Sequence, residues 1–545
     1  MDYKALADLL YPNVPDNAAD KYEEIYPPRK LPEAAKVTRI APSPTGFVHF
    51  GTLYPLLITE RLARQSGGVM YLRIEDTDGK REIKGAINDL IDVLSYFGFN
   101  FDESITAGGE YGPYKQTERK DIYSAYAKKL ISEGKAYPCF CTAEELSEIR
   151  SIQEQNKKTT GYYGEYIKCR HLSLDEIKSK LDAGIPYVIR FKSDGKEENK
   201  IKFTDLIKGE IELCENFIDH VIIKSDGIPP YHFAHAVDDH LMRTTHVVRG
   251  EEWLPSLPLH LQLFDALGFK RLKYIHHSQL MKKENDSIKK LSKRDHGASI
   301  SDYIEDGYPP LAVVEYIMTL LNSNFEDWRR ANPDTSYKNF EFTIKKISPS
   351  GSVFDIVKLN DVSKNVIATF TAEEVYEQVC KWAEKFDADL FSKLTADPAY
   401  AKKIFAIGRG TPKARKDIAV WAEVKEYLSF FYDEYFRYID KIPEQYKTED
   451  IKTALNSFLE TLDINDNMDE WFNKVKEICP KINYCPNTKE YKQNPEQYGG
   501  HIGDVSMFIR IALTGRTNAP DLYAVIQILG KDTVEKRINN FINKL

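Results

Sequence analysis

The stretch VTRIAPSPTGFVHFGTLYPLLITERLA, residues 37–63, decides the fold. Residues 37–41 predict a short buried strand, and residues 53–63 predict a helix. A turn rich in proline and glycine separates them. Gly67 and Gly68 end the helix, and residues 69–75 predict a second strand. This order of elements predicts a right-handed parallel crossover of the doubly wound, Rossmann type.

The rest of the chain changes character several times. Residues 1–36 are interrupted by proline, so we expect two small helices at most, without a shared core, and treat the segment as an appendage. Residues 155–215 mix charged turns with alternating runs, which indicates an inserted α+β module. Residues 245–249 and 274–277 predict strands that return to the parallel sheet, and helical periodicity dominates from about residue 305 onward.

Composition excludes several classes of protein. The chain has 545 residues, of which 42% are hydrophobic, enough for several separate cores. Lys and Arg number 75 against 83 Asp and Glu, a net charge of -8, so any nucleic-acid surface must be local. No run of about 18 apolar residues and no secretory signal occurs, which predicts a cytoplasmic protein without a membrane partner. The 7 cysteines favour reduced thiols or one metal site.

Two loops carry candidate chemistry. The turn at residues 41–52 joins the first strand to its helix, where backbone N–H groups and the helix dipole favour a phosphate. His49 in this turn is placed to donate a hydrogen bond to a phosphoryl group in transfer; a tight turn with an exposed histidine is the alternative. Residues 289–294 concentrate positive charge that suits a triphosphate, although a solvated charge run is the usual explanation.

Together the loops resemble the two signature motifs of class I aminoacyl-tRNA synthetases. His49-Phe-Gly51-Thr is similar to the HIGH motif, and Lys290-Leu-Ser-Lys293-Arg is similar to the KMSKS motif. The stretches at residues 39–46, 72–78 and 248–253 look like bacterial-type glutamyl-tRNA synthetases, and the resemblance runs from about Val37 to the C-terminus.

This resemblance implies an α/β Rossmann-type parallel-sheet catalytic domain with an α+β insertion, followed by an all-α C-terminal tRNA-binding half. The expected segments are an N-terminal extension (1–36), the first catalytic half (37–117), an acceptor-binding insertion (118–228), the second catalytic half (229–265), a stem-contact domain (266–365) and a helical anticodon-binding domain (366–545).

The resemblance also implies a glutamate site. The residues expected to contact the amino acid are Arg39, Ala41, Ser43, Glu75, Tyr231, His235 and Arg249. Glutamate carries two carboxylates and one ammonium, so its pocket needs two cationic sites and one acceptor. We assign Arg39 to the side-chain carboxylate and Arg249 to the α-carboxylate; ordinary surface salt bridges are the alternative.

His235 departs from the family, which often has Asn there; an imidazole still donates to a carboxylate, but it titrates near neutrality. A competing hypothesis is a metal site built from His232, His235, Asp239 and His240.

The same resemblance assigns nucleotide chemistry. The residues expected to bind ATP are His49, Gly51, Glu252, Trp253 and Lys293, and those expected in catalysis are His49, Gly51, Lys290 and Lys293. ATP would act with Mg²⁺, joining L-glutamate to tRNA(Glu) through a glutamyl-adenylate, in an enzyme expected to be a monomer. The rivals are a non-discriminating enzyme that also glutamylates tRNA(Gln), a small-molecule nucleotidyltransferase and an inactive RNA-binding paralogue.

Cysteines suggest one structural zinc. Cys139, Cys141 and Cys169 resemble the zinc-binding insertion of some family members, with His171 or Tyr163 as the fourth ligand; metal-free reduced thiols are the alternative.

In the C-terminal half, a cluster of cations is placed to neutralise tRNA phosphates: Lys402, Lys403, Arg409, Lys413, Arg415 and Lys416. The aromatic run at residues 430–438 favours helix core over a base-stacking platform.

Overall fold

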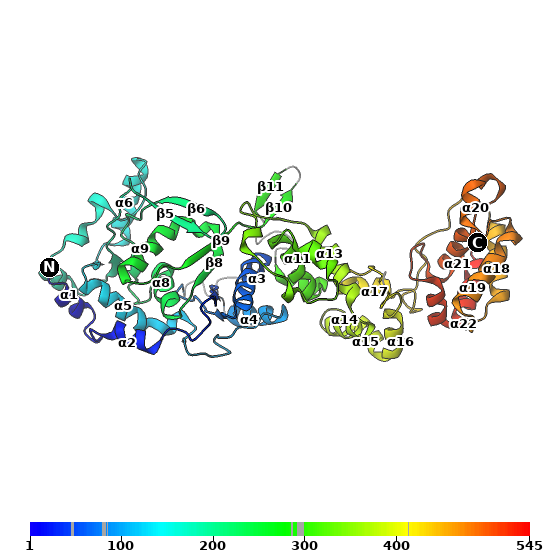
Figure 1. Cartoon of the computed structure of the whole chain (residues 1–545), viewed down its shortest axis with the longest axis horizontal. Coiled ribbons are helices and arrows are strands. Elements are labelled where there is room, and N and C mark those ends of the chain that lie inside the picture. The colour runs from blue at the N-terminus through cyan, green and yellow to red at the C-terminus, as the bar shows by residue number, and fades with distance from the viewer. Residues whose placement is uncertain (45–47, 79–82, 84, 285–286, 291–298, 412–413) are drawn as a thin grey trace. The chain divides into compact units, whose positions relative to one another are not determined.

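The computed structural model describes residues 1–545 except 45–47, 79–82, 84, 285–286, 291–298 and 412–413 (Figure 1). The chain divides into two compact units. Unit 1 comprises Met1–Asp302 and Val314–Asp355, and unit 2 comprises Tyr303–Val313 and Ile356–Leu545. The six segments expected from the sequence subdivide the chain more finely and stay a prediction.

Parallel strands form the centre of unit 1. Strand β1 (Val37–Ile40) pairs in parallel with β2 (Val69–Leu72), and β8 (His246–Gly250) pairs in parallel with β9 (Lys273–His277). The pairs meet at β1 and β8, where Thr245 N donates to Val37 O at 2.9 Å. Helix α3 (Phe50–Gln65) connects β1 to β2, which confirms the predicted parallel crossover. The loops at the carboxyl ends of these strands are therefore where a ligand site is expected.

The remaining elements of unit 1 surround this sheet. Its other helices are α1 (Tyr3–Leu10), α2 (Ala18–Ile25), α4 (Ala86–Tyr96), α5 (Lys120–Ser132), α6 (Ala143–Gln155), α7 (Leu174–Asp182), α8 (Tyr231–Leu241), α9 (Leu257–Leu267) and α12 (Phe325–Ala331). Helices α10 (Ile300–Asp306) and α11 (Pro310–Leu321) each have residues in both units.

An inserted module interrupts the parallel strands, as the sequence predicts. Strands β3 (Ala136–Cys139), β4 (Val188–Phe191) and β7 (Val221–Ile223) form an antiparallel sheet. Strands β5 (Lys200–Asp205) and β6 (Gly209–Cys214) form an antiparallel hairpin. A further small sheet holds β10 (Met281–Glu284), β11 (Ser287–Lys290) and β12 (Val353–Phe354). The insertion is therefore α+β, in contrast to the parallel layer.

The N-terminal segment is not an appendage, and our expectation was wrong. Its two short helices exist, but Leu6 is fully buried and belongs to the main core cluster of unit 1. Arg29 pairs with Glu103 at 2.6 Å, and Glu23 lies 2.8 Å from His240 and 2.9 Å from Arg243. These ion pairs attach the segment to Glu103, to His240 within α8 and to Arg243 just after α8.

Unit 2 is helical, as predicted. Its helices are α13 (Ile356–Thr369), α14 (Ala372–Phe386), α15 (Ala388–Ala396), α16 (Pro398–Phe405), α17 (Val424–Tyr427), α18 (Thr448–Thr461), α19 (Met468–Ile478), α20 (Thr488–Gln493), α21 (Ile502–Thr514) and α22 (Leu522–Ile542). Side chains that begin helices also cap them: Thr371 and Glu374 form a capping box at α14. The predicted helix at residues 430–438 is absent; Phe430 and Phe431 are buried, but the segment consists of turns and irregular backbone.

Across the described parts of the chain, no helix combines the length and apolar character that crossing a bilayer requires.

Candidate active site

A cavity of about 330 Å³ opens beside the carboxyl ends of β1 and β8. Its walls include most of the amino-acid and ATP residues expected from the sequence: Arg39, Ala41, Ser43, His49, Gly51, Glu75, Tyr231, Arg249, Glu252 and Trp253. These side chains come from segments far apart in the sequence, and the strands and α8 bring them together. His235 is not among the residues that line the cavity.

Arg39 is held by a buried carboxylate. Its Nε donates to both oxygens of Asp239, at 3.2 and 3.1 Å, and Nη1 donates to Val248 O at 3.5 Å. Although burial acts in the opposite direction, the guanidinium groups of Arg39 and Arg73 keep the pKa of Asp239 well below its usual range. The ionised carboxylate fixes the orientation of Arg39 at the cavity wall.

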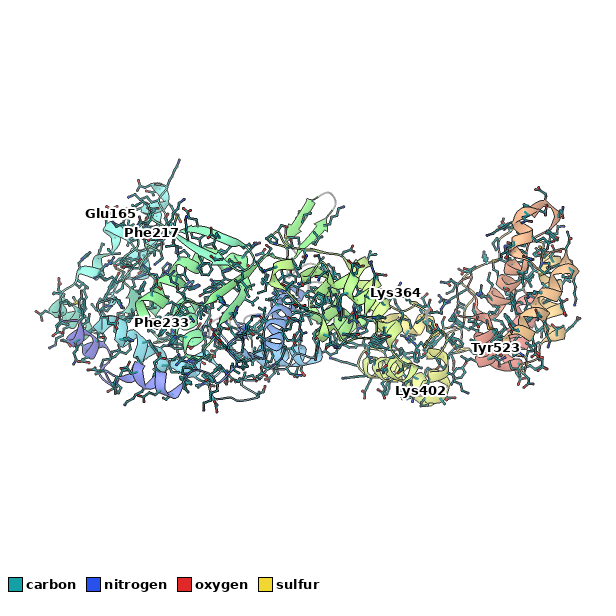
Figure 2. The ribbon with its side chains drawn as sticks, in the orientation of Figure 1. Glu165, Phe217, Phe233, Lys364, Lys402 and Tyr523 are labelled. Carbon is teal, nitrogen blue, oxygen red and sulfur yellow. The ribbon has the colours of Figure 1, made fainter. Side chains whose placement is uncertain are left out.

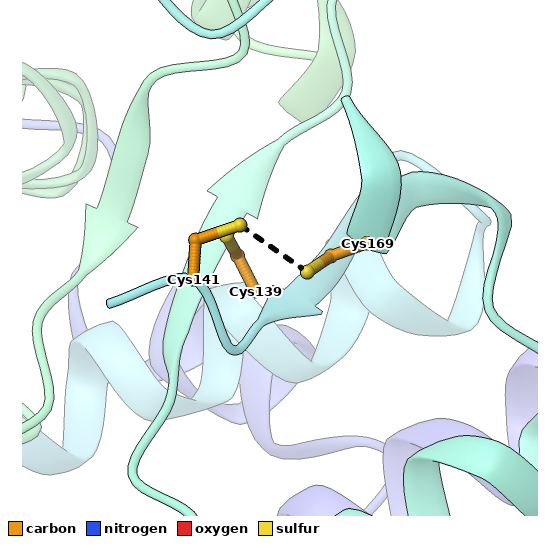
Figure 3. A group of neighbouring side chains, drawn as sticks. All are labelled: Cys139, Cys141 and Cys169. Carbon is orange, nitrogen blue, oxygen red and sulfur yellow. Dashed lines mark hydrogen bonds between the residues drawn. The ribbon is translucent and has the colours of Figure 1, made fainter. Parts of the chain in front are cut away.

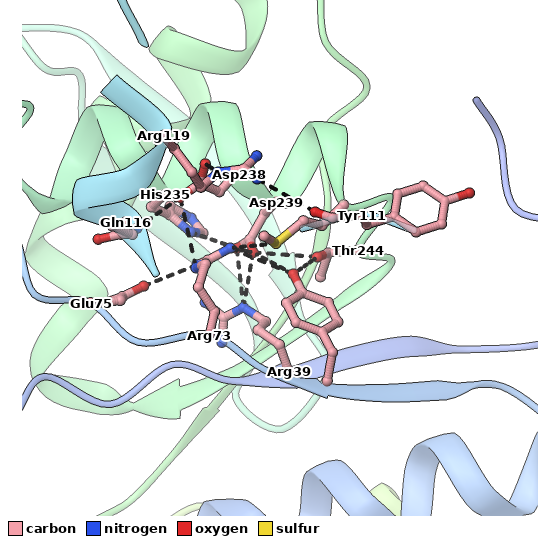
Figure 4. Close-up of polar contacts among 12 residues, drawn as sticks. Arg39, Arg73, Glu75, Tyr111, Gln116, Arg119, His235, Asp238, Asp239 and Thr244 are labelled. Carbon is pink, nitrogen blue, oxygen red and sulfur yellow. Dashed lines mark hydrogen bonds and ion pairs between the residues drawn. The ribbon is translucent and has the colours of Figure 1, made fainter. Parts of the chain in front are cut away.

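Arg73 links this pair to Glu75 (Figure 4). Its Nη1 donates to Asp239 at 2.7 Å, and its Nη2 donates to Glu75 Oε1 at 2.9 Å. Burial raises the pKa of Glu75, and the charge of Arg73 opposes that change. Glu75 therefore lines the cavity as a hydrogen-bond acceptor, and its bond to Arg73 fixes its position.

The sequence reasoning missed a second half of this network. Asp238 is fully buried and accepts hydrogen bonds from Arg119 at 2.7 Å, Gln116 at 2.8 Å and Tyr123 at 2.8 Å. Buried charges are costly unless they are paired, so these contacts fix the carboxyl-terminal part of α8. The signal was present: Asp238 and Asp239 directly follow the apolar pair Ala236-Val237 within one helix.

Arg249 is positioned by imidazoles. Its Nε donates to His276 Nε2 at 2.9 Å, and its Nη1 lies 3.1 Å from His260 Nδ1. The guanidinium carbon lies 4.7 Å from the centre of the Tyr274 ring. Within the described chain, Nη2 is buried without a hydrogen-bond partner. A buried unpaired donor on a cavity-lining cation is a ready site for a ligand carboxylate.

Tyr231 and His235 lie on one face of α8, as helical spacing predicts, with ring centres 5.5 Å apart. His235 is fully buried behind Tyr231, with Nε2 at 2.9 Å from Tyr274 OH and Nδ1 at 2.7 Å from Asp239. Burial lowers its pKa to about 4, so the ring is neutral at physiological pH. It therefore supports the cavity wall.

The competing metal site on α8 does not assemble. His232 pairs with His260, whereas His240 lies against Glu23 and stacks on Phe269. The only group of potential metal ligands within the described ranges consists of cysteines.

The first signature loop contacts residues 299–300, which come after the second loop in the sequence. His49 forms an isolated bridge with Ser299, and Ile300 N donates to Val48 O at 3.4 Å. A Cβ added at Gly51, the second residue of α3, would lie 2.9 Å from His49 Nδ1, so a larger residue there would displace the His49 side chain. Lys290 ends β11, and Lys293 lies outside the described residues.

The three cysteines of the insertion converge (Figure 3). Their Sγ atoms lie within 4.8 Å of one another, and Cys141 Sγ is 3.6 Å from Cys169 Sγ. A tetrahedral zinc with bonds of about 2.3 Å places sulfurs about 3.8 Å apart, so the spacing fits the ion.

The expected fourth ligands are not in this group. His171 is exposed, and Tyr163 OH donates to Thr159 O. The hydroxyl of Tyr162, which the sequence reasoning did not select, lies 3.3 Å from Cys141 Sγ.

Several cations of the predicted phosphate-binding cluster in unit 2 already form ion pairs or hydrogen bonds within the protein. Lys402, labelled in Figure 2, pairs with Glu373 at 2.6 Å, and Arg415 pairs with Asp417 at 2.5 Å. Arg409 donates to Ile367 O at 2.6 Å. Lys416 is exposed, and Lys413 lies outside the described residues. The cluster therefore offers less free charge to an RNA than its sequence indicates.

Comparisons with known families match this architecture. The family model described as "tRNA synthetases class I (E and Q), catalytic domain" matches residues 36–361, and the model "Anticodon binding domain" matches residues 374–542. The fold and the cavity thus define a class I tRNA synthetase.

Individual relatives identify the family within the class I tRNA synthetases. A glutamate–tRNA ligase of Acetivibrio thermocellus is 47% identical, with 99% of this chain and 100% of the relative covered. One of Clostridium perfringens strain 13 is 48% identical over the same shares. The crystal structure of a glutamate tRNA ligase from Elizabethkingia meningosepticum, in complex with its amino acid, is 28% identical with a TM-score of 0.75 and covers 94% of this chain and 99% of its own. The chain belongs to the glutamate–tRNA ligase family.

Proposed function

We propose that this chain uses ATP to ligate L-glutamate to tRNA(Glu) through a glutamyl-adenylate. The observation that carries the proposal is the cavity that places Arg39, Arg249 and Glu75 beside the His49–Gly51 turn. Two cations and one acceptor match the two carboxylates and the ammonium of glutamate. The names of the relatives support the same substrates.

The amino acid is oriented by these three groups. Arg249 offers its unpaired Nη2 to the α-carboxylate, and Arg39 receives the side-chain carboxylate. Glu75 accepts from the ammonium, whose positive charge favours the ionised form of Glu75. Arg39 keeps its ion pair with Asp239, but glutamine would place a neutral amide where the remaining donors of Arg39 meet a carboxylate. By analogy with a truncated charge pair this costs about 2–5 kcal/mol, which selects against glutamine without an editing domain.

In the activation step, an oxygen of the glutamate α-carboxylate bonds to the α-phosphorus of ATP, and the bond to pyrophosphate breaks. His49 lies at the start of α3 and donates to the α-phosphoryl oxygens, with Lys293 assigned to the departing pyrophosphate. Mg²⁺ that accompanies ATP supplies charge neutralisation. Glu252 and Trp253 line the same cavity and are assigned to the ribose and base.

In the transfer step, the 2′-hydroxyl of the terminal adenosine of tRNA bonds to the carbonyl carbon of the adenylate, and AMP leaves. No covalent enzyme intermediate is required. The helical unit 2 is assigned to the anticodon end, because the family model over residues 374–542 describes such a domain. Cys139, Cys141 and Cys169 would hold a structural zinc in the insertion. We assign a monomer, an assignment that the molar mass in solution would test.

Isotope exchange between pyrophosphate and ATP tests the proposal. We expect exchange that requires glutamate, measured with and without tRNA. Exchange without glutamate would favour a nucleotidyltransferase, and no exchange under either condition would favour an inactive paralogue. Charging of purified tRNA(Glu) and tRNA(Gln) then defines the tRNA range.

A further inference from the structure

Behind the cavity, five side chains form a continuous hydrogen-bonded line. Asp205 Oδ2 lies 2.8 Å from His276 Nδ1, and His276 Nε2 lies 2.9 Å from Arg249 Nε. On the other side, Arg249 Nη1 lies 3.1 Å from His260 Nδ1, and His260 Nε2 lies 2.9 Å from His232 Nδ1. Arg249 sits at the centre of this line, and it is the member that carries the unpaired Nη2.

The chemistry of arginine sets the direction of each bond. A guanidinium group has only donors, so His276 Nε2 and His260 Nδ1 must both accept from it. Each ring is therefore neutral and carries its proton on the opposite nitrogen. His276 then donates from Nδ1 to Asp205, and His260 donates from Nε2 to His232. A single pattern of tautomers satisfies the whole line.

We propose that His260 and His276 are positioning residues that act as paired neutral acceptors and hold Arg249 with Nη2 directed to the substrate carboxylate. The inference rests on the proposed role of Arg249 in glutamate binding. Two acceptors fix a planar fork at two points, so the third nitrogen has a defined place.

Other ionisable groups around His260 fit this assignment. From α8, His232 and His235 face it with ring centres at 5.1 and 4.8 Å, and the Tyr231 ring lies at 5.8 Å. From β8 and β9 it faces Arg249 and His276. Burial, with His235 and Arg249 next, lowers the pKa of His260 well below its usual value. For His276, burial lowers the pKa, and the bond to Asp205 opposes the change.

Protonation of these rings in acid would therefore weaken the hydrogen bonds that hold Arg249. Protonation of His260 would replace the acceptor at Nδ1 by a donor and place a second cation beside the guanidinium group. The fork would lose one of its two supports. We expect the KM for glutamate to rise as the pH falls, with kcat changing less.

Three variants test the role of His260 in glutamate-dependent pyrophosphate exchange. His260→Leu removes the acceptor and should raise the KM for glutamate about ten-fold or more, the equivalent of one hydrogen bond to a charged group. His260→Asn places an amide oxygen near the position of Nδ1 and should restore most of the affinity while weakening the rise of KM in acid. His246→Asn is the matched control: His246 is also buried, with its pKa lowered to about 4, but it bonds to Thr245 and should leave KM unchanged.

A second measurement needs no activity. Imidazole ¹⁵N spectra of the wild-type full chain, assigned with the His260→Asn and His276→Gln variants, should show the His260 proton on Nε2 and the His276 proton on Nδ1 at neutral pH. A proton on His260 Nδ1 overturns the proposal, even if the enzyme is active. Equal KM values in the wild type, His260→Leu and His260→Asn also overturn it, as do equal increases in both variants. Absence of glutamate-dependent exchange in the wild type contradicts the proposed function instead, and the tautomers then decide whether the line of acceptors exists.

Discussion

His49 and Ser299 form an isolated antiparallel bridge, although most of unit 1 separates them in the sequence. Ser299 lies shortly after Arg294, which ends the segment that resembles the second signature motif, and His49 belongs to the first. The bridge therefore places a residue that follows the second motif against the first motif. The cavity that Arg39 and Arg249 line lies beside this contact, since His49 also lines it. Convergence of the two loops over one nucleotide requires this arrangement.

Replacing the lysine of the second loop tests that convergence. Lys293→Ala should reduce the rate of glutamate activation by roughly 10²–10³, because a charge that stabilises the transition state is removed. The affinity for tRNA should stay nearly intact. Pyrophosphate exchange and tRNA binding measure the two effects, with exposed Lys21→Ala as the control. Equal losses of rate and tRNA affinity would count against the assigned role.

Arg39→Lys tests recognition of the side-chain carboxylate. Lysine carries the charge but lacks the planar fork that meets Asp239 and leaves further donors for a ligand. We expect the KM for glutamate to rise about 30-fold or more, since an incomplete buried charge pair costs about 2–5 kcal/mol. Arg64→Lys, at a partly exposed pair with Asp102, is the matched control. An unchanged KM in Arg39→Lys would remove this residue from the glutamate site.

The attachment of the N-terminal segment predicts a dependence of stability on pH. Burial acts to raise the pKa of Glu23, but hydrogen bonds from His240, Tyr126 and Arg243 lower it from 4.5 to about 2. A lowered folded-state pKa stabilises the protein above about pH 4.5, and this contribution is lost as the pH falls toward about 2.

Glu23→Gln should therefore lower the free energy of unfolding near neutral pH by about 1 kcal/mol, because the pair is partly exposed. Urea unfolding at several pH values measures the effect, and the difference from wild type should shrink in acid. Glu24→Gln, which changes an exposed neighbouring carboxylate, is the control. A difference that persists unchanged below pH 4.5 would refute the ion-pair explanation.

The cysteine group predicts one zinc per chain. Cys169→Ser should abolish the metal and lower the stability of the insertion, since metal binding is coupled to folding. Cys214→Ser changes an exposed thiol outside the group and should retain the metal. Elemental analysis of the purified proteins decides the question; wild-type protein without zinc would favour reduced thiols.

Local signals explain what the sequence predicted well. The strand at residues 37–40 and helix α3 follow from a short stretch with β-branched Val37, Thr38 and Ile40, a proline-rich turn and a pair of glycines. Gly134, just past the end of α5, has a φ of +70°, the left-handed conformation that glycine commonly adopts at a helix C-terminus. The cavity residues were found because motif resemblance placed them, which periodicity alone does not do.

Long-range pairing explains what the sequence analysis missed. Asp239 meets Arg39 and Arg73 across much of unit 1, and no spacing rule joins residues so far apart. His260 and His276 can be assigned a role only once the structure shows Arg249 hydrogen-bonded between them. The N-terminal segment did offer a signal, since Leu6 and Leu10 lie on one helix face and both are buried.

Discrimination between amino acids tests the central claim most directly. Pyrophosphate exchange with purified full-length protein and tRNA should give a kcat/KM for glutamate about 30-fold to several thousandfold above that for glutamine, the ratio that a cost of about 2–5 kcal/mol produces. This result would show that the cavity recognises a second carboxylate through its paired guanidinium groups. Equal kcat/KM values for the two amino acids would contradict the account.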